Sequence, residues 1–119
     1  MLVKIIEILN NYVDNISLYL IILLIKFSLL LDAPENVTVT STNPQGVKEG
    51  QSATLTCYAD GFPLPSFSWK FNGNPVNGAQ QKTLVLTNAR VDNAGNYTCV
   101  ARNFRGSKEF TREVHVRCK

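Results

Sequence analysis

The feature that most limits the fold of this chain is a period-two alternation of apolar and polar side chains within residues 32–119. Apolar side chains occupy positions 53, 55, 57 and 59, and hydroxyl side chains occupy positions 52, 54 and 56. Similar short runs begin near residues 36, 67, 82, 97 and 107. Alternation of this kind predicts strands with one buried face. We therefore expect an all-β fold of six or seven short strands in two antiparallel sheets.

The breaks between these runs carry turn residues. The segment Gly61–Pro65 contains two prolines, which cannot donate to a central strand ladder. The pair Asn72-Gly73 directly follows an alternating run and predicts a tight hairpin, because both residues tolerate positive φ angles. The segments Asn77-Gly78 and Asn103–Gly106 predict two further turns.

Composition divides the chain near residues 32–34. Residues 1–31 contain sixteen Leu or Ile and no Gly, Pro or Cys, whereas residues 32–119 hold all seven Gly, all five Pro and all three Cys. The second part is long enough for one compact domain and too short for a large enzyme fold. The net charge of +3 is modest, and no basic stripe interleaved with aromatic residues indicates a nucleic-acid binder.

Residues 1–31 form an apolar leader, in which thirteen of the sixteen residues from Ile16 to Leu31 are apolar. As a helix this stretch would measure about 24 Å, less than the ~30 Å hydrocarbon core of a bilayer. Three interpretations stay open: a cleaved signal peptide, a signal anchor with Lys26 reaching a headgroup layer, and an artefact of the gene model. We expect none of the three to be a folded part of the domain.

Two cysteines and a tryptophan stand at informative spacings on the alternating runs. Cys57 and Cys99 are 42 residues apart, and Trp69 lies on the run between them. Cysteines on the inward faces of two stacked sheets can bridge the ~10 Å layer between the sheets. A large indole can fill the space beside such a bridge.

The residues just before Cys99 add a second motif. Tyr97 precedes Cys99 by two positions and so shares its strand face. Its hydroxyl can then bind a backbone group of the preceding turn. In that turn, Gly95 permits a close approach and Asp92 can accept backbone donors.

Together these motifs resemble the immunoglobulin superfamily, and specifically an intermediate-type or C2-type Ig-like domain, over residues 34–117. The matching stretches are GQSATLTCYADGFPLPSFSWKFNG at 50–73 and LVLTNARVDNAGNYTCVARN at 84–103. The resemblance implies an antiparallel two-sheet immunoglobulin-like sandwich with Greek-key connections and a Cys57–Cys99 disulfide. The core signature that it implies consists of Trp69, Leu86, Asp92, Gly95 and Tyr97. The short interval between Trp69 and Lys82 favours the smaller sandwich over a variable-type domain.

Some residues outside this signature are candidates for modification, for thiol pairing or for catalysis. Asn36 and Asn96 begin N-x-Thr triplets that would accept glycans in a secreted chain. Cys118 is the odd cysteine, which pairs with another chain or domain or remains a free thiol. His115 alternates with two valines and is expected to be an outward strand residue. No nucleophile elbow, phosphate-binding glycine loop or metal motif is present in the sequence, so we expect no enzyme activity, no metal and no cofactor.

The resemblance implies an extracellular, secreted or cell-surface module for adhesion or recognition through a protein partner, with a second copy of the chain as one candidate. Loop tips project furthest from the core, so the expected contact loop is Asn103, Phe104, Arg105, Gly106 and Lys108. An anionic glycan is a further candidate partner, because Arg102, Arg105, Lys108 and Arg112 surround the last hairpin. We expect no nucleic acid, and contact with a membrane only through the leader or flanking segments. The alternatives are a structural spacer of an intracellular muscle-type filament protein and a fragment of a soluble immune-type receptor.

In the last alternating run, Arg112 shares the phase of its apolar neighbours, which predicts a bulge or a snorkelling side chain.

Overall fold

The computed structural model describes residues 1–12 and 15–118, and the chain divides into two compact units, residues 1–31 and 32–119. The first unit consists of helices α1 (Leu2–Tyr12) and α2 (Asn15–Leu30). The side chains of α2 are apolar on nearly every side, and none of them is buried. Among the residues that the structure describes, no helix combines the length and the apolar character needed to cross a membrane.

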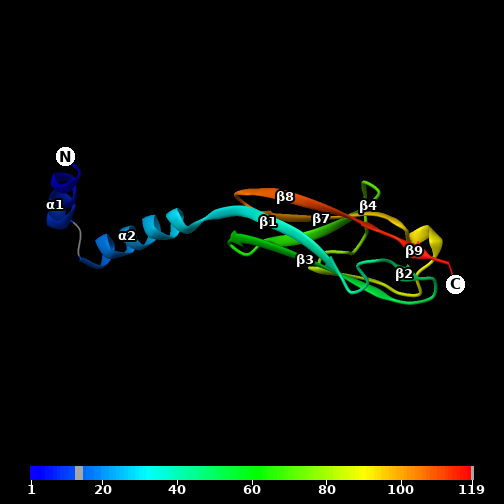
Figure 1. The fold of residues 1–119 in the computed structure, drawn as a ribbon. Helices are drawn as coiled ribbons and strands as arrows, with labels where there is room; N and C mark the ends of the chain where they lie inside the picture. The colour runs from blue at the N-terminus through cyan, green and yellow to red at the C-terminus, as the bar shows by residue number, and fades with distance from the viewer. Residues whose placement is uncertain (13–14, 119) are drawn as a thin grey trace. The chain divides into compact units, whose positions relative to one another are not determined.

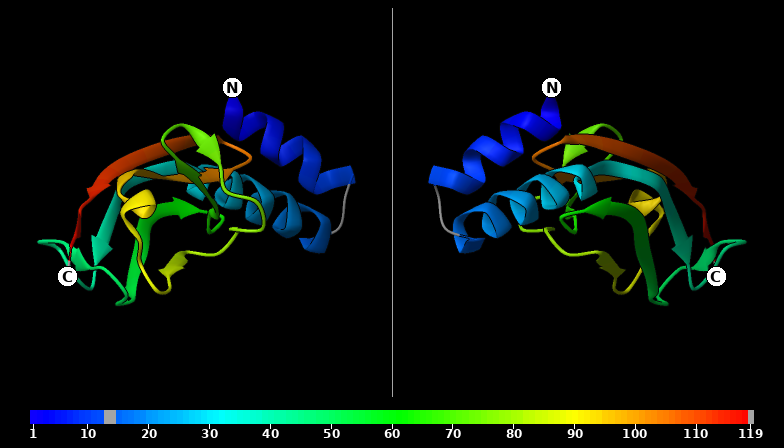
Figure 2. Two further views of the ribbon diagram at one scale, coloured as in Figure 1. Left: turned by 90° about the vertical axis from the view of Figure 1, so that its right-hand side faces the viewer. Right: turned by 90° about the vertical axis from the view of Figure 1, so that its left-hand side faces the viewer.

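The second unit is built mainly from two antiparallel sheets, with a separate parallel pair of very short strands (Figure 1). The three-stranded sheet has the order β1-β3-β6, the four-stranded sheet has the order β5-β4-β7-β8, and β2 pairs with β9 in parallel. The bounds are β1 (Asp32–Ser41), β2 (Val47–Lys48), β3 (Ala53–Phe62), β4 (Ser66–Phe71), β5 (Asn74–Pro75), β6 (Thr83–Leu86), β7 (Gly95–Asn103), β8 (Gly106–Val114) and β9 (Val116–Arg117), with a short 3₁₀ helix η1 (Val91–Asn93). Viewed along the strands, β3 and the β7–β8 hairpin lie on opposite sides of the unit (Figure 2). The predicted two-sheet sandwich is confirmed.

The core lies between the two sheets and follows the alternation of the sequence. On β3 the buried residues are Ala53, Leu55 and Cys57, and on β7 they include Tyr97 and Cys99. Trp69 from β4 is the largest fully buried side chain. On β3 burial alternates along the strand and selects its register, whereas β7 is buried on both faces from Tyr97 to Ala101.

The hairpin predicted at Asn72-Gly73 joins β4 to β5. Both residues have positive φ, 48° and 85°, as a two-residue hairpin with the twist of the strands requires. Lys70 and Phe71 pair with Pro75 and Asn74 across this turn, which confirms the prediction.

The two ends of the sandwich differ in what they carry (Figure 1). At one end lie the start of β1, the β3–β4 loop (residues 63–65) and the β7–β8 turn (residues 104–105); we call it the loop end. At the other end lie η1, β9 and the C-terminus. Strand β8 runs from the loop end toward the opposite end, so the long axis of the unit follows the strands.

The last hairpin shows one departure from simple alternation. Arg112 is half-buried, and its Nη1 donates to the carbonyl oxygen of Val39 at 3.2 Å. The guanidinium therefore reaches across from β8 to β1 and joins the edges of the two sheets. Phe110 remains 38% exposed, because β8 is an edge strand whose outer flank has no sheet neighbour.

Candidate functional site

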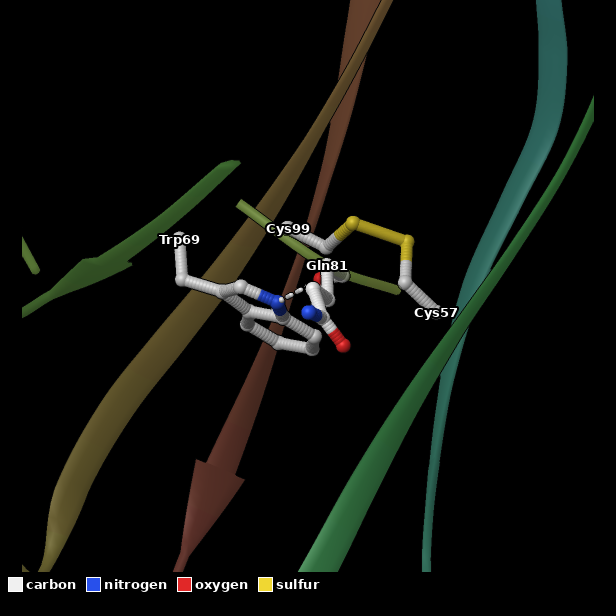
Figure 3. The surroundings of a disulfide bond; sticks show 4 residues. All are labelled: Cys57, Trp69, Gln81 and Cys99. Carbon is white, nitrogen blue, oxygen red and sulfur yellow. Dashed lines mark hydrogen bonds between the residues drawn. A yellow bond between two sulfur atoms is a disulfide. The ribbon is translucent and has the colours of Figure 1, made fainter. Parts of the chain in front are cut away.

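The centre of the unit is a disulfide between the two sheets (Figure 3). Cys57 on β3 and Cys99 on β7 are fully buried, with an S–S distance of 2.03 Å and a Cα–Cα distance of 6.3 Å. Trp69 lies beside this bond and is 1% exposed. Its indole Nε1 donates to the carbonyl oxygen of Gln81 at 2.9 Å, so the buried polar atom of the ring has a partner. The disulfide fixes the separation of the two sheets. The positions of the surface residues depend on this separation.

Tyr97 connects the core to the turn that precedes β7. Its hydroxyl donates to the carbonyl oxygen of Asn93 at 2.7 Å, and its ring lies 4.7 Å from that of Phe71, centroid to centroid. Burial raises the pKa of the Tyr97 phenol above its ordinary value, because the charged form is poorly solvated there. The side chain therefore stays a hydrogen-bond donor at neutral pH.

The other members of the expected core signature take different roles. Gly95 has a φ of 153°, and a Cβ on it would lie 2.6 Å from Oδ1 of Asn72. Leu86 is half-buried against the core. Asp92 is exposed in η1, and Oδ1 of Asn93 accepts the hydrogen bond from the backbone N–H of Arg90 at 2.7 Å. The side chain that accepts in this turn is thus that of Asn93, one residue after Asp92.

The candidate contact site is the loop end, and Asn103 holds it together. Nδ2 of Asn103 donates to the carbonyl oxygens of Asp32, at 2.7 Å, and Pro63, at 3.1 Å. Its Oδ1 accepts from the backbone N–H of Arg105 at 2.9 Å. One half-buried amide thereby ties together the start of β1, the β3–β4 loop and the β7–β8 turn. Turns bound in this way are pre-organised before any partner arrives.

Two large apolar side chains project from the loop end. Phe104, at the tip of the β7–β8 turn, is 70% exposed, and Leu64, in the β3–β4 loop, is 86% exposed. Gly106 begins β8 next to this tip, and Lys108 follows opposite Ala101 in the register. The loop end thus presents apolar tips flanked by the expected contact residues.

The basic residues near the last hairpin do not share one face of the sheet. Arg102 pairs with Ser66 and has the alternation phase of the outward side chains, whereas Lys108 and Arg112 pair with inward-phase positions of β7. Arg112 is also engaged by the Val39 carbonyl. These cations are therefore divided between two sides of the hairpin, which argues against a single extended polyanion surface.

The two glycan acceptor triplets lie on different sheets. Nδ2 of Asn36 on β1 donates to Oδ2 of Asp60 at 2.8 Å, and Asn36 has a φ of 51°. Asn96 is exposed on the outer side of β7. The threonine of its triplet, Thr98, is buried, and its hydroxyl oxygen lies 2.6 Å from the hydroxyl oxygen of Thr111. Glycosylation at either position stays a prediction.

Cys118 and His115 lie at the end opposite the loop end. Cys118 is an exposed free thiol. His115 is exposed, and its Nε2 lies 3.9 Å from Oε1 of Glu113. Within residues 1–12 and 15–118, His, Cys, Asp and Glu form no group of three or more that could hold a metal ion.

Comparison with known proteins identifies the family of this arrangement. A family model described as "Immunoglobulin domain" matches residues 34–103. The chain belongs to the immunoglobulin domain family. Hemicentin-1 of Mus musculus is 38% identical over 90 residues, which cover 68% of this chain and 2% of that protein. The chain therefore spans a small fraction of the length of the curated relatives that it matches.

Solved immunoglobulin structures agree with the fold. A chain from "Structural basis for Dscam isoform specificity" has a TM-score of 0.60 and 27% identity, covering 71% of this chain and 22% of that one. The full Ig1–Ig3 ectodomain of mouse nectin-like molecule 4 has a TM-score of 0.63 and 26% identity, covering 72% of this chain and 31% of that one. The immunoglobulin domain of this chain is thus similar in fold and sequence to units of multi-domain proteins.

Sequence reasoning missed several residues that shape the site. The tip residues of the β7–β8 turn were expected, but the apolar Leu64 and the triple role of Asn103 were not. An Asn before a turn commonly accepts a hydrogen bond two residues on, and that signal was available. The contacts of Asn103 with Asp32 and Pro63 join segments 71 and 40 residues apart, and they have no local signature.

Proposed function

We propose that this chain is a non-catalytic, extracellular immunoglobulin-type binding module that acts in adhesion or recognition through protein–protein contacts. The observation that carries the proposal is the pre-organised loop end. Asn103 fixes three segments there, and Phe104 and Leu64 expose apolar surface on them. Rigid loops with exposed aromatic tips lose little conformational entropy on binding, and aromatic anchors are common binding hot spots.

The Cys57–Cys99 disulfide supports the extracellular assignment. It is buried between the sheets and closes a loop of 42 residues. Disulfides of this kind persist in oxidising compartments and are rare in the cytosol. The acceptor asparagines of the two glycan triplets, Asn36 and Asn96, are exposed, which is consistent with the same compartment. This is the ground for preferring an extracellular module over an intracellular filament spacer.

The contact loop is tested by changing its apolar tips to acidic residues. Beads coated with the full chain are mixed with one another and, separately, with cells, so that self-association and binding to another protein are both measured. We expect Phe104→Asp combined with Leu64→Asp to abolish bead aggregation or cell binding. The matched control is Val85→Asp, because Val85 is also apolar and is 55% exposed on β6, away from the loop end.

Three outcomes would overturn parts of the proposal. Equal loss of binding in the Val85 control would show that the surface is not the loop end. Unchanged binding in the double variant would exclude both tips from the contact. Native protein found in the cytosol with Cys57 and Cys99 reduced would favour the filament alternative.

A further inference from the structure

A pocket lies on the outer face of the four-stranded sheet, separate from the core. One of its lining residues, Ser66, directly follows the β3–β4 loop of the loop end. The volume of the pocket is about 350 Å³. Its lining consists of Ser66, Phe67, Ser68, Gln80, Val100 and Arg102. Small-ligand pockets begin at about 300 Å³, so this volume suits one compact ligand.

The register of β4 and β7 explains how the lining forms. Ser66 pairs with Arg102, and Ser68 pairs with Val100, so these four side chains form two adjacent rows on one face. The hydroxyl of Ser66 donates to the carbonyl oxygen of Arg102 at 3.2 Å. Val100 is only 8% exposed and supplies the apolar floor, whereas Phe67 pairs with Ala101, has the inward phase and packs against the core.

Arg102 is the charged member of the lining, and its guanidinium is not engaged by an acid. The ion pairs among the described residues join Lys70 to Glu109, at 3.3 Å, and His115 to Glu113, at 3.9 Å. Glu109 on β8 pairs with Val100 on β7. Its carboxylate therefore lies in the row of side chains next to the row that contains Arg102. Since Lys70 already holds Glu109, the planar fork of Arg102 is available to a carboxylate from outside.

We propose that this pocket binds one carboxylated sugar residue of an acidic polysaccharide. The carboxylate is bound by the guanidinium of Arg102 in a charge-assisted, bidentate pair. The Ser66 hydroxyl already donates to the Arg102 carbonyl, so it accepts from a sugar hydroxyl. The Ser68 hydroxyl and the Gln80 amide donate to and accept from the other sugar hydroxyls. The C–H face of the ring packs on Val100. A heavily sulfated chain would need several cations on one face, whereas this pocket offers one.

Saturation-transfer NMR on the full chain tests the proposal, because it reads the ligand directly and detects weak binding. The probes are a hexuronate trisaccharide and a neutral hexose trisaccharide of the same linkage. We expect saturation transfer to the acidic sugar and not to the neutral one. Arg102→Gln should weaken binding by about tenfold or more, the loss expected for a hydrogen bond to a charged group.

Two variants make the result specific. Arg117→Gln removes the same charge from an exposed position on β9, outside the pocket lining and at the end opposite the loop end, and should leave binding unchanged. Arg102→Lys keeps the charge without the fork and should fall between the wild type and Arg102→Gln, which also covers the case in which Arg102→Gln fails to fold.

Three results would overturn the assignment. The first is an equal loss of binding in the Arg102→Gln and Arg117→Gln variants. The second is equal binding of the two sugars, and the third is saturation transfer to a glutamate-containing peptide in place of the acidic sugar. The loop-end contact proposed above is tested separately, because Phe104 and Leu64 are not part of this lining.

Discussion

The side-chain amide of Asn72 occupies the space in which residue 95 would place a Cβ. Oδ1 of Asn72 accepts from the backbone N–H of Asn96 at 2.9 Å, and the same oxygen lies 2.6 Å from the ideal Cβ position of Gly95. The β4–β5 turn and the start of β7 are therefore fitted to each other through a glycine.

Gly95→Ala should lower the free energy of unfolding by about 2–4 kcal/mol, because the new Cβ meets Asn72 and the φ of 153° disfavours side chains. Urea unfolding measures the effect. The double variant with Asn72→Gly should recover part of the loss, since the steric conflict is removed while the backbone strain remains. If the second substitution gives no recovery, the clash with Asn72 is not the cause.

Trp69→Ala should cost about 3–5 kcal/mol, because it empties the largest fully buried site in the core. Trp69→Phe keeps most of the volume but leaves the Gln81 carbonyl without its indole donor, and should cost about 1–3 kcal/mol. Chemical denaturation of both variants checks the order. An unchanged melting temperature in Trp69→Ala would contradict the burial of the indole.

The Cys57–Cys99 disulfide should account for about 4 kcal/mol of stability in the chain-entropy account of a 42-residue loop. The variant with Cys57→Ala and Cys99→Ala measures this contribution by denaturation. Cys118→Ser is the matched control and should have no effect, because that thiol is exposed and unpaired. Peptide mapping of the native protein should recover Cys57 linked to Cys99, and a main species containing Cys118 would contradict the structure.

Stability should fall at alkaline pH through Tyr97. Its pKa is raised by burial in the folded state, so the unfolded chain loses this proton first as the pH increases. The stabilising contribution is therefore present below the ordinary tyrosine pKa of about 10 and is lost above it. Unfolding measured between neutral pH and about pH 11 should show a steeper decline in the wild type than in Tyr97→Phe. Parallel declines would assign the effect to other groups.

Asn103→Ala should loosen the loop end without unfolding the core. It removes both hydrogen bonds from Nδ2 and the acceptor for Arg105, at an expected cost of about 1–2 kcal/mol. Hydrogen exchange should accelerate at the amides of residues 32, 33 and 103–106, while the amides of β3 and β7 near Cys57 and Cys99 remain protected. Asn103→Asp keeps the acceptor oxygen and loses the donors, and should give an intermediate result.

The sequence specified the parts of the fold in which a pattern repeats. The alternation around Cys57, Trp69 and Cys99 predicted β3, β4 and β7, because burying one face of a strand imposes a period of two. The parallel pairing of Val47 with Val116 was not predicted, since strands of two residues leave no periodic signal. The choice of Asn93 over Asp92 as acceptor also depends on the exact backbone of η1, because both side chains carry a suitable oxygen.

The loop end and β9, which Cys118 directly follows in the sequence, lie at opposite ends of the sandwich (Figure 1). Strand β8 connects the two regions with nine residues, which span about 30 Å in an extended chain. A tether attached at the Cys118 thiol, whether a second chain or a coupling reagent on a solid support, therefore points the Phe104 tip outward. Immobilisation through this thiol therefore presents the loop end on the side of the domain away from the support.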